Sequence, residues 1–310
     1  MGSFELNGVE IEDTFAEAFP MLLGRVLITA ENDEWALIAS RTATGFASSI
    51  IMSPAEAGIE GIVVPKEKTP DGRVGRYIQI YHRSGRDLKL QLIARIGQCI
   101  LTCPTTNCFN GFPEAKKKLK IGDAIRLFGD GFEEKITLNG REVWKIPVME
   151  GEFLIERRFG IKRGVAGGNF LIMAEDREKA LEAAKRACEA IKKIEGVILP
   201  FPGGICRSGS KVGSLKYKLP ASTNHIYCPL LRGKVKETQV PEGVNSIYEI
   251  VFNGLNPEII KRATKEGILE AIKVKGVVKI TAVNFGGKLG PIKVSLKDAL
   301  TNSFKIDRFK

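Results

Sequence analysis

Short apolar runs rich in β-branched residues alternate along the chain with longer stretches in which apolar residues recur at helical spacing. In the first half this pattern predicts strand, helix, strand, strand, helix and strand. The predicted bounds are Arg25–Ala30, Asp33–Ala43, Ser49–Met52, Tyr77–His82, Asp87–Gly97 and Cys99–Cys103. The second half predicts the same order over Asn169–Ala174, Arg177–Ile194, Val197–Leu199, Ser246–Asn253, Pro257–Lys273 and Val277–Val283.

The two halves are copies of one another. Residues 27–43 read LITAENDEWALIASRTA and residues 171–187 read LIMAEDREKALEAAKRA, with nine identities in 17 positions. Chance at ordinary composition gives roughly one. Each copy has the order of a split βαβ, or ferredoxin-like, unit, in which two helices cover one face of a sheet. The sequence therefore predicts an α+β protein with two duplicated ferredoxin-like lobes, residues 1–147 and 148–310.

Additional β-structure is predicted outside the duplicated elements. Asn7-Gly8 and Asn139-Gly140 each lie between alternating apolar residues, which is a strong signal for a tight hairpin. We expect residues 124–160 to form a β-rich connecting segment. A further strand is predicted at Ile292–Leu296.

The charge of the chain narrows the class of partner. Among 310 residues, Lys and Arg number 47 against 36 Asp and Glu, a formal net charge of +11. That balance favours an anionic partner: nucleic acid, a membrane surface or a polyanionic small molecule. Aromatic residues are 7% and do not interleave with a basic stretch, which argues against nucleic acid. No apolar run approaches the ~18 residues of a membrane span, and no signal peptide is recognised, so we expect a cytoplasmic protein.

Several familiar catalytic devices are missing from the sequence. None of the six cysteines forms a C-x-x-C pair, so in a cytoplasmic protein we expect free thiols. The two histidines, His82 and His225, have no ligand spacing, and we expect no metal site. The sequence contains no G-x-S-x-G elbow, P-loop or G-x-G-x-x-G.

Three glycine clusters fall at the ends of predicted strands in the second copy: Val165–Phe170, Phe201–Gly204 and Asn284–Gly290. A tight turn is the simplest explanation of any one of them. Their grouping favours a role in lining a site, because paired glycines let a backbone approach a ligand closely. The candidate binding residues are Asn169, Gly203, Gly204, Asn284, Phe285, Gly286 and Gly287.

Longer motifs spread over nearly the whole chain carry a resemblance. They are Asn7–Phe19, Pro54–Gly58, Arg95–Gln98, Phe128–Gly131, Val143–Pro147, Glu150–Phe153, Phe201–Gly204, Leu219–Asn224, Tyr248–Val251 and Asn284–Gly290. In these runs the sequence resembles the formylmethanofuran:tetrahydromethanopterin formyltransferase family. The resemblance implies reversible transfer of a formyl group from formylmethanofuran to N5 of tetrahydromethanopterin, without a metal or a covalent enzyme intermediate. It also implies a homo-oligomer, a dimer or tetramer.

The resemblance accounts for the positive charge without nucleic acid or membrane, since both coenzyme substrates are polyanionic small molecules. It implies no tightly bound cofactor. Direct transfer through a tetrahedral intermediate needs two aligned amines, hydrogen-bond donors for the oxyanion and a group that moves a proton. Backbone N–H groups of a glycine turn suit the oxyanion, and Asn169 and Asn284 are candidates to present amides to the pterin or the formyl oxygen.

Glu249 is the candidate acid/base. It lies within the apolar strand Ile247–Phe252, where poor hydration would raise the pKa of a carboxyl group. The resemblance assigns the acid/base role to the glutamate of the Tyr-Glu-Ile-Val run, which is Glu249 here. The competing interpretation is a glutamate on an exposed sheet face. Aligning the second parts of the copies at an offset of 170 places Gln79 opposite Glu249, which predicts that only the second lobe kept the chemistry.

Two other functions stay open. The chain could be the transferase subunit of a bacterial formyltransferase/hydrolase complex in formaldehyde oxidation. It could also be a non-catalytic ferredoxin-like binding module, because fold does not imply function. Neither the direction of transfer nor the coenzyme variants follow from the residues.

Overall fold

A computed structural model describes residues 2–301. Contacts within it define two compact units. The middle unit is residues 21–164, and the split unit combines residues 1–20 with 165–310. The domain boundary at 147/148 stays a prediction. The compact units divide the chain differently, because the N-terminal hairpin described below pairs with the sheet of the second copy.

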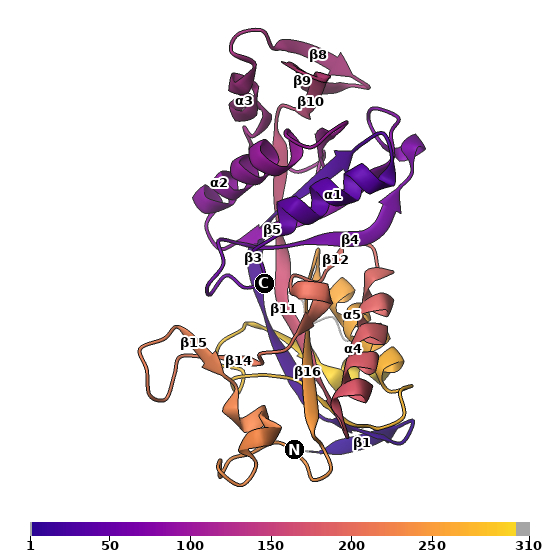
Figure 1. Cartoon of the computed structure of the whole chain (residues 1–310), viewed down its shortest axis with the longest axis vertical. Helices are drawn as coiled ribbons and strands as arrows, with labels where there is room; N and C mark the ends of the chain where they lie inside the picture. The colour runs from indigo at the N-terminus through magenta and orange to yellow at the C-terminus, as the bar shows by residue number, and fades with distance from the viewer. Residues whose placement is uncertain (1, 302–310) are drawn as a thin grey trace. The chain divides into compact units, whose positions relative to one another are not determined.

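The middle unit contains the first ferredoxin-like arrangement (Figure 1). Its elements are β3 (Phe15–Thr29, of which residues 21–29 belong here), α1 (Asp33–Thr44), β4 (Glu56–Val64), β5 (Gly75–His82), α2 (Gly85–Arg95) and β6 (Asn107–Asn110). The strands pair antiparallel in the order β4–β5–β3–β6. Ala39 of α1 and Leu88 and Leu92 of α2 pack into one core with Ile78 and Ile80 of β5, so both helices cover the same face.

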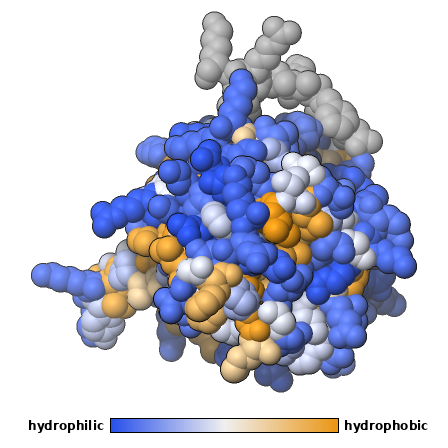
Figure 2. All heavy atoms as spheres, turned by 90° about the horizontal axis from the view of Figure 1, so that it is seen from above, coloured by the Kyte–Doolittle hydropathy of each residue, from blue (hydrophilic) through white to orange (hydrophobic). Residues whose placement is uncertain are grey.

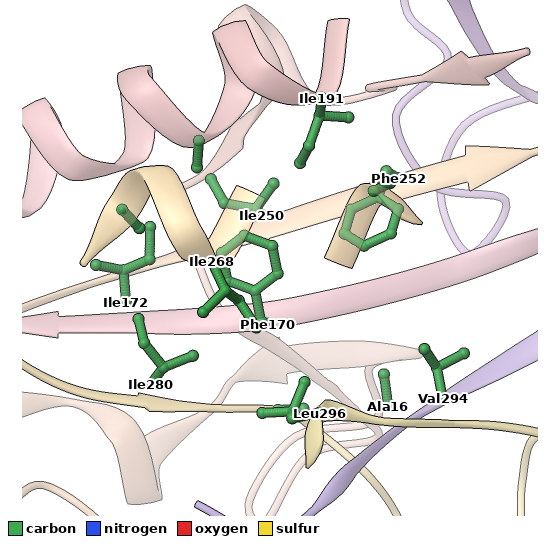
Figure 3. Close-up of a cluster of buried hydrophobic side chains, with 14 of the residues drawn as sticks. Ala16, Phe170, Ile172, Ile191, Ile250, Phe252, Ile268, Ile280, Val294 and Leu296 are labelled. Atoms are coloured by element: carbon green, nitrogen blue, oxygen red, sulfur yellow. The ribbon is translucent and has the colours of Figure 1, made fainter. Parts of the chain in front are cut away.

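The split unit repeats this arrangement. Its elements are β11 (Phe159–Ala174, of which residues 165–174 belong here), α4 (Arg177–Lys192), β12 (Val197–Ile198), β13 (Ile205–Cys206), β16 (Ser246–Gly254), α5 (Pro257–Ala271) and β17 (Val277–Thr281). Strands β12 and β13 pair with β16, β16 with β11, and β11 with β17, all antiparallel. Figure 3 shows the helix-side core, where Phe170, Ile172, Ile250, Phe252 and Ile280 meet Ile191 of α4 and Ile268 of α5. The expected pair of ferredoxin-like lobes is confirmed.

Side-chain caps explain where the four long helices begin. Asn32, Ser84, Asp176 and Asn256 precede α1, α2, α4 and α5, and each accepts a hydrogen bond from the backbone N–H three residues later. Such caps satisfy donors that the first helical turn leaves open. The caps fix the strand-to-helix turns of both copies at matching places.

The two predicted hairpins form: the N-terminal hairpin extends the sheet of the second copy, and the hairpin at 134–148 extends the sheet of the first copy. β1 (Ser3–Leu6) and β2 (Val9–Glu12) turn at Asn7 and Gly8, both with positive φ, and β2 pairs parallel with β17. β8 (Glu134–Leu138) and β9 (Arg141–Val148) turn at Asn139-Gly140, and β10 (Gly151–Glu156) pairs parallel with β6. Because the N-terminal hairpin adds to the second copy's sheet, the first twenty residues join the split unit.

Two predicted strands of the first copy are wrong. Residues 49–53 form a turn, in which the Ser53 N–H donates to the Ser49 carbonyl at 2.8 Å, and the strand begins only at Glu56, beyond Pro54. The strand predicted at Cys99–Cys103 is also wrong: residues 96–100 are a π-helical continuation of α2, with Ile96 and Ile100 buried, and the fourth strand is β6 at Asn107–Asn110. The apolar residues of this continuation recur at helical spacing, which a short window cannot distinguish from a buried strand.

The remaining elements are short, and the predicted strand near residue 292 is among them. They are η1 (Lys66–Lys68), the π-helix η2 (Ile96–Ile100), β7 (Lys118–Leu119), α3 (Gly122–Ile125), η3 (Arg126–Gly129), η4 (Pro202–Gly204), β14 (Ser210–Val212), β15 (Ala221–Thr223), η5 (His225–Tyr227), η6 (Pro229–Leu231), β18 (Ile292–Ser295) and α6 (Leu296–Thr301). Strand β18 pairs with the first part of β3 inside the split unit.

Hydrophilic residues predominate on the face of the molecule shown in Figure 2, and hydrophobic residues gather there in small patches. Within the part of the chain that the structure describes, no helix has both the length and the apolarity to cross a membrane.

Candidate active site

Glu249 lies on the face of the split unit's sheet opposite α4 and α5. Its neighbour Ile250 is fully buried in the helix-side core, and alternate residues of a strand point to opposite faces. Strand register places Glu249 between Cys206 of β13 and Leu171 of β11, and Leu171 is in turn opposite Thr281 of β17. Paired residues share a face, so these four side chains form one row across the sheet.

A long segment between β13 and β16 packs over this face. Tyr227, Val240 and Val244 of the segment cluster with Leu171 and Met173 of β11. The copies differ in length in this region. Helices α1 and α4 begin 144 residues apart, at Asp33 and Arg177, whereas α2 and α5 begin 172 apart, at Gly85 and Pro257. The second copy therefore has 28 additional residues before its second helix, and they help to enclose the Glu249 row.

The surroundings of Glu249 favour its neutral form. The residue is half-buried among strands and the overlying segment, and desolvation of its carboxyl raises its pKa to about 7. A hydrogen bond with the Cys206 thiol acts in the opposite direction by stabilising the carboxylate. A carboxyl group with a pKa near neutrality accepts and releases protons readily at cellular pH, which is the property a general acid/base needs. The predicted location in a poorly hydrated strand is found, and the catalytic role stays a prediction.

Two polar neighbours that the sequence analysis did not single out border Glu249. Burial raises the pKa of the Cys206 thiol, with the Glu249 charge adding to the effect, and the thiol lies 3.5 Å from Ser208 Oγ. Tyr227 hydrogen-bonds Thr281. Burial, followed by the charges of Glu12 and Glu249, raises the pKa of Tyr227 to about 12, so its hydroxyl stays protonated. No motif marks these residues, because strand register and the long segment bring them to Glu249.

The glycine turn before β13 is close to the row. Gly203 and Gly204 have φ of +65° and +89°, a conformation that favours glycine. The Gly204 N–H closes the turn on the Phe201 carbonyl at 2.8 Å, and its carbonyl accepts from the Cys188 thiol. A side chain at Gly203 would meet nothing within 4 Å. Cys206, which is opposite Glu249, follows Gly204 by two residues.

Asn169 and Asn284 hold the chain together rather than presenting their amides outward. Asn169 Oδ1 accepts from the Val283 N–H at 2.9 Å, and its Nδ2 donates to the Gly167 carbonyl. Asn284 Nδ2 donates to Thr14 Oγ1 and to the Phe15 carbonyl. Both amides therefore have hydrogen-bond partners within the chain, and a role for Asn169 or Asn284 in binding substrate stays a prediction.

Backbone N–H groups of the loop at 284–290 also have hydrogen-bond partners within the chain. Those of Phe285 and Gly287 donate to the carboxylate of Glu17, at 2.7 and 2.5 Å, and that of Gly286 donates to Asn284 Oδ1. They are therefore poor candidates for the oxyanion donors expected from the glycine pattern. A role for Phe285, Gly286 or Gly287 in binding substrate through other atoms stays a prediction.

Gln79 is not the counterpart of Glu249. In β3, Leu27 is opposite Tyr77, whereas Leu171, the copy of Leu27, is opposite Glu249. The matching offset is therefore 172 rather than 170, and Tyr77 occupies the equivalent position. Gln79 is fully buried one row away, where its Nε2 donates to Glu60 Oε1 at 2.7 Å.

Within residues 2–301, no group of three or more His, Cys, Asp or Glu side chains is placed to hold a metal ion. The six cysteines are free. A cavity of about 650 Å³ opens in the middle unit, lined in part by Asp71, Arg73, Cys103 and Glu150, and none of the predicted site residues is among its walls.

Comparison with known proteins gives consistent matches over both copies. Residues 4–148 match the family model described as formylmethanofuran-tetrahydromethanopterin formyltransferase, and residues 151–299 match the model described as its proximal lobe. Formyltransferases of that name from Archaeoglobus fulgidus and Methanocaldococcus jannaschii are 56% and 55% identical, over 95% of this chain and 99% of theirs.

Two solved structures are similar. The formyltransferase of Methanosarcina barkeri has a TM-score of 0.93 and 52% identity, and the match covers 96% of this chain and 100% of that one. The formyltransferase/hydrolase complex of Methylorubrum extorquens with methylofuran contains a chain with a TM-score of 0.92 and 42% identity, covering 96% and 99%.

Proposed function

The chain belongs to the formylmethanofuran–tetrahydromethanopterin formyltransferase family, and we propose that it moves a formyl group reversibly between formylmethanofuran and N5 of tetrahydromethanopterin. The observation that carries the mechanism is the half-buried Glu249, whose pKa is raised to about 7. Both coenzymes act as substrates that come and go, and no tightly bound cofactor or metal is part of the proposal.

Direct transfer requires one proton to change places. The N5 amine attacks the formyl carbon and forms a new C–N bond, which gives a tetrahedral intermediate with a negatively charged oxygen. Glu249, starting as the carboxylate, takes the proton from N5 and then gives it to the methanofuran nitrogen as the original C–N bond breaks. A carboxyl with a pKa near 7 suits both steps, because it neither holds nor releases the proton too strongly.

The oxyanion needs donors near Glu249, and in the turn before β13 the candidate is the Gly203 N–H, because the Gly204 N–H is bound to the Phe201 carbonyl. The turn opens to space at Gly203 and leads directly into the strand that holds Cys206 beside Glu249. The loop at 284–290 fits this role less well, since the N–H groups of Phe285, Gly286 and Gly287 have partners within the chain. Aligning two bound substrates beside these groups would supply most of the remaining rate enhancement.

The net charge of +11 supports substrates that carry several negative charges. A positive field attracts such ligands and raises their rate of association. We further propose a cytoplasmic homo-oligomer, a dimer or tetramer, in line with the sequence resemblance.

The match to a chain of the Methylorubrum extorquens formyltransferase/hydrolase complex keeps a second candidate open, a transferase subunit that works with a hydrolase. Co-purification from the native host distinguishes the two. A hydrolase subunit that stays bound through several columns would favour the complex, and a homo-oligomer alone would favour the stand-alone enzyme.

The direct test is formyl transfer by the purified protein, followed by absorbance in both directions and with a chelator present. Turnover that persists in chelator supports the metal-independent reaction. A folded protein that binds neither coenzyme would contradict the proposal, and one that binds both without turnover would favour the non-catalytic binding module.

A further inference from the structure

Glu17 holds the loop at 284–290 by its carboxylate. The side chain is 3% exposed and accepts four backbone hydrogen bonds. Its Oε1 accepts from the N–H groups of Phe285 and Gly287 at 2.7 and 2.5 Å. Its Oε2 accepts from those of Leu289 and Gly290 at 2.9 and 2.6 Å. One buried charge therefore fixes nearly the whole length of this loop.

The loop begins close to Glu249. The Val283 N–H is bound to Asn169, and Asn169 lies two residues from Leu171, which is directly opposite Glu249. Residues two apart in a strand share a face and are separated by about 6.6 Å. Asn169 is thus one row from Glu249 on the same side of the sheet. The loop leaves β17 from that row, next to the proposed site.

Glu17 leaves the other side of the loop open. Phe285 is 40% exposed and Leu289 is 47% exposed, and a side chain at Gly286 would meet nothing within 4 Å. A loop with Gly286, Gly287 and Gly290 has little conformational preference of its own. Without the carboxylate, ordering such a loop around a ligand would cost binding free energy.

We infer that Glu17 is a positioning residue for the transfer reaction: it locks the loop at 284–290 as one wall of the site, with Phe285 and Leu289 presented to a flat ring of a coenzyme. This inference rests on the proposed function. The aromatic face of Phe285 and the apolar surface of Leu289 suit contact with a planar ring system. Neither side chain is titratable, so the proposed proton transfer is assigned to Glu249 alone.

Loss of a preorganised wall should weaken substrate binding more than it slows the chemical step. Glu17→Gln keeps the shape of the side chain but turns an NH₂ group toward one pair of N–H donors, which breaks the bonds to Phe285 and Gly287 or those to Leu289 and Gly290. We expect the KM for one coenzyme to rise about tenfold or more, with kcat within about threefold of wild type and its pH dependence unchanged.

The experiment combines kinetics with amide hydrogen exchange over residues 284–290, followed by mass spectrometry. Glu17→Gln should accelerate exchange in this loop as well as raise KM. Glu182→Gln, which changes an exposed glutamate on α4, is the matched control and should alter neither. Phe285→Ala keeps the backbone bonds to Glu17, so it should raise the same KM while exchange stays slow.

The outcomes separate the two proposals. A wild-type protein without transfer overturns the proposed function, whatever the exchange shows. With an active wild type, an unchanged KM in both Glu17→Gln and Phe285→Ala overturns the role of the loop as a wall. If Glu17→Gln does not fold, Phe285→Ala alone decides this point. Normal exchange in a folded Glu17→Gln would overturn the role of the carboxylate.

Discussion

Cys206 lies directly opposite Glu249 across the β13–β16 pair, and its thiol hydrogen-bonds the Glu249 carboxyl group. Burial raises the pKa of Glu249 to about 7, and this hydrogen bond keeps it from rising further. The two residues belong to strands that are separated in sequence by the 207–245 segment. Their pairing gives the candidate acid/base one fixed partner in a poorly hydrated place.

The first prediction concerns that partner. Cys206→Ala removes a hydrogen bond that favours the carboxylate, so the pKa of Glu249 should rise. Because the proposed mechanism requires the carboxylate form to accept the proton from N5, the acidic limb of the profile of kcat/KM against pH should move upward by about half a unit to one unit. Cys206→Ser retains a donor and should leave the limb near its original position. An acidic limb that does not move in Cys206→Ala would show that the Cys206 thiol does not affect the pKa of Glu249.

The second prediction concerns the buried polar cluster of the middle unit. Gln79→Glu would place a carboxylate where the Gln79 amide now donates to Glu60, beside the ion pair of Glu60 with Arg25. The new carboxylate would keep the Tyr81 hydroxyl as a donor but would face the buried carboxylate of Glu60, so it should lower the free energy of unfolding by about 3–5 kcal/mol, measured by urea denaturation. It should create no second active site, so we expect turnover per folded protein to be the same as in wild type.

Tyr77→Glu is the variant matched to that experiment, because Tyr77 is the position equivalent to Glu249. It too should add no transfer activity, since the middle unit has no counterpart of the 28 additional residues that help to enclose Glu249. Additional turnover in either variant would contradict the assignment of the chemistry to the split unit.

The third prediction is a dependence of stability on pH through Glu17. Burial alone would raise the pKa of Glu17, but the backbone bonds from Gly290, Phe285, Gly287 and Leu289 outweigh it and lower the pKa below its ordinary value of 4.5. A lowered folded-state pKa stabilises the protein above the unfolded-state pKa, and this contribution is lost as pH falls through the folded-state value.

The measurement is the difference in free energy of unfolding between wild type and Glu17→Gln as a function of pH. The difference should be full at neutral pH and should shrink as pH falls below about 4.5, where the carboxylate of the unfolded chain begins to protonate. A difference that is constant across this range would show that the Glu17 charge has no role in holding the loop.

Sequence reasoning predicted the elements that carry strong local signals. The duplicated strand–helix unit around Leu27 and Leu171 and the two Asn-Gly hairpins are found where the pattern placed them. The strand predicted at Cys99–Cys103 was wrong, because the short apolar run that continues α2 fits a buried strand as well as a helix. The pairing of the N-terminal hairpin with the sheet of the second copy has no local signal, since it depends on which sheet edge the hairpin meets.

The residues of the candidate site also differ in how far the sequence could predict them. The poorly hydrated surroundings of Glu249 could be predicted from its apolar strand, and its catalytic role stays a prediction that the resemblance to known formyltransferases implies. Glu17 could not, since its partners lie 268–273 residues away and nothing in the run Phe15–Phe19 distinguishes it from a surface glutamate of a strand. The offset of 170 was wrong by two residues, a shift that keeps every side chain on the same face and so leaves the alternation of apolar residues intact.

The fourth prediction is the most direct test of the account: kcat/KM for formyl transfer against pH, for wild type and Glu249→Gln, with Glu182→Gln as the control. Wild type and control should lose activity as pH falls through about 7, where Glu249 becomes protonated. Glu249→Gln should be slower by a factor of about 10² or more and should lack that ionisation. Transfer by Glu249→Gln at nearly the wild-type rate, with the same acidic limb, would contradict the assignment of Glu249 as the acid/base.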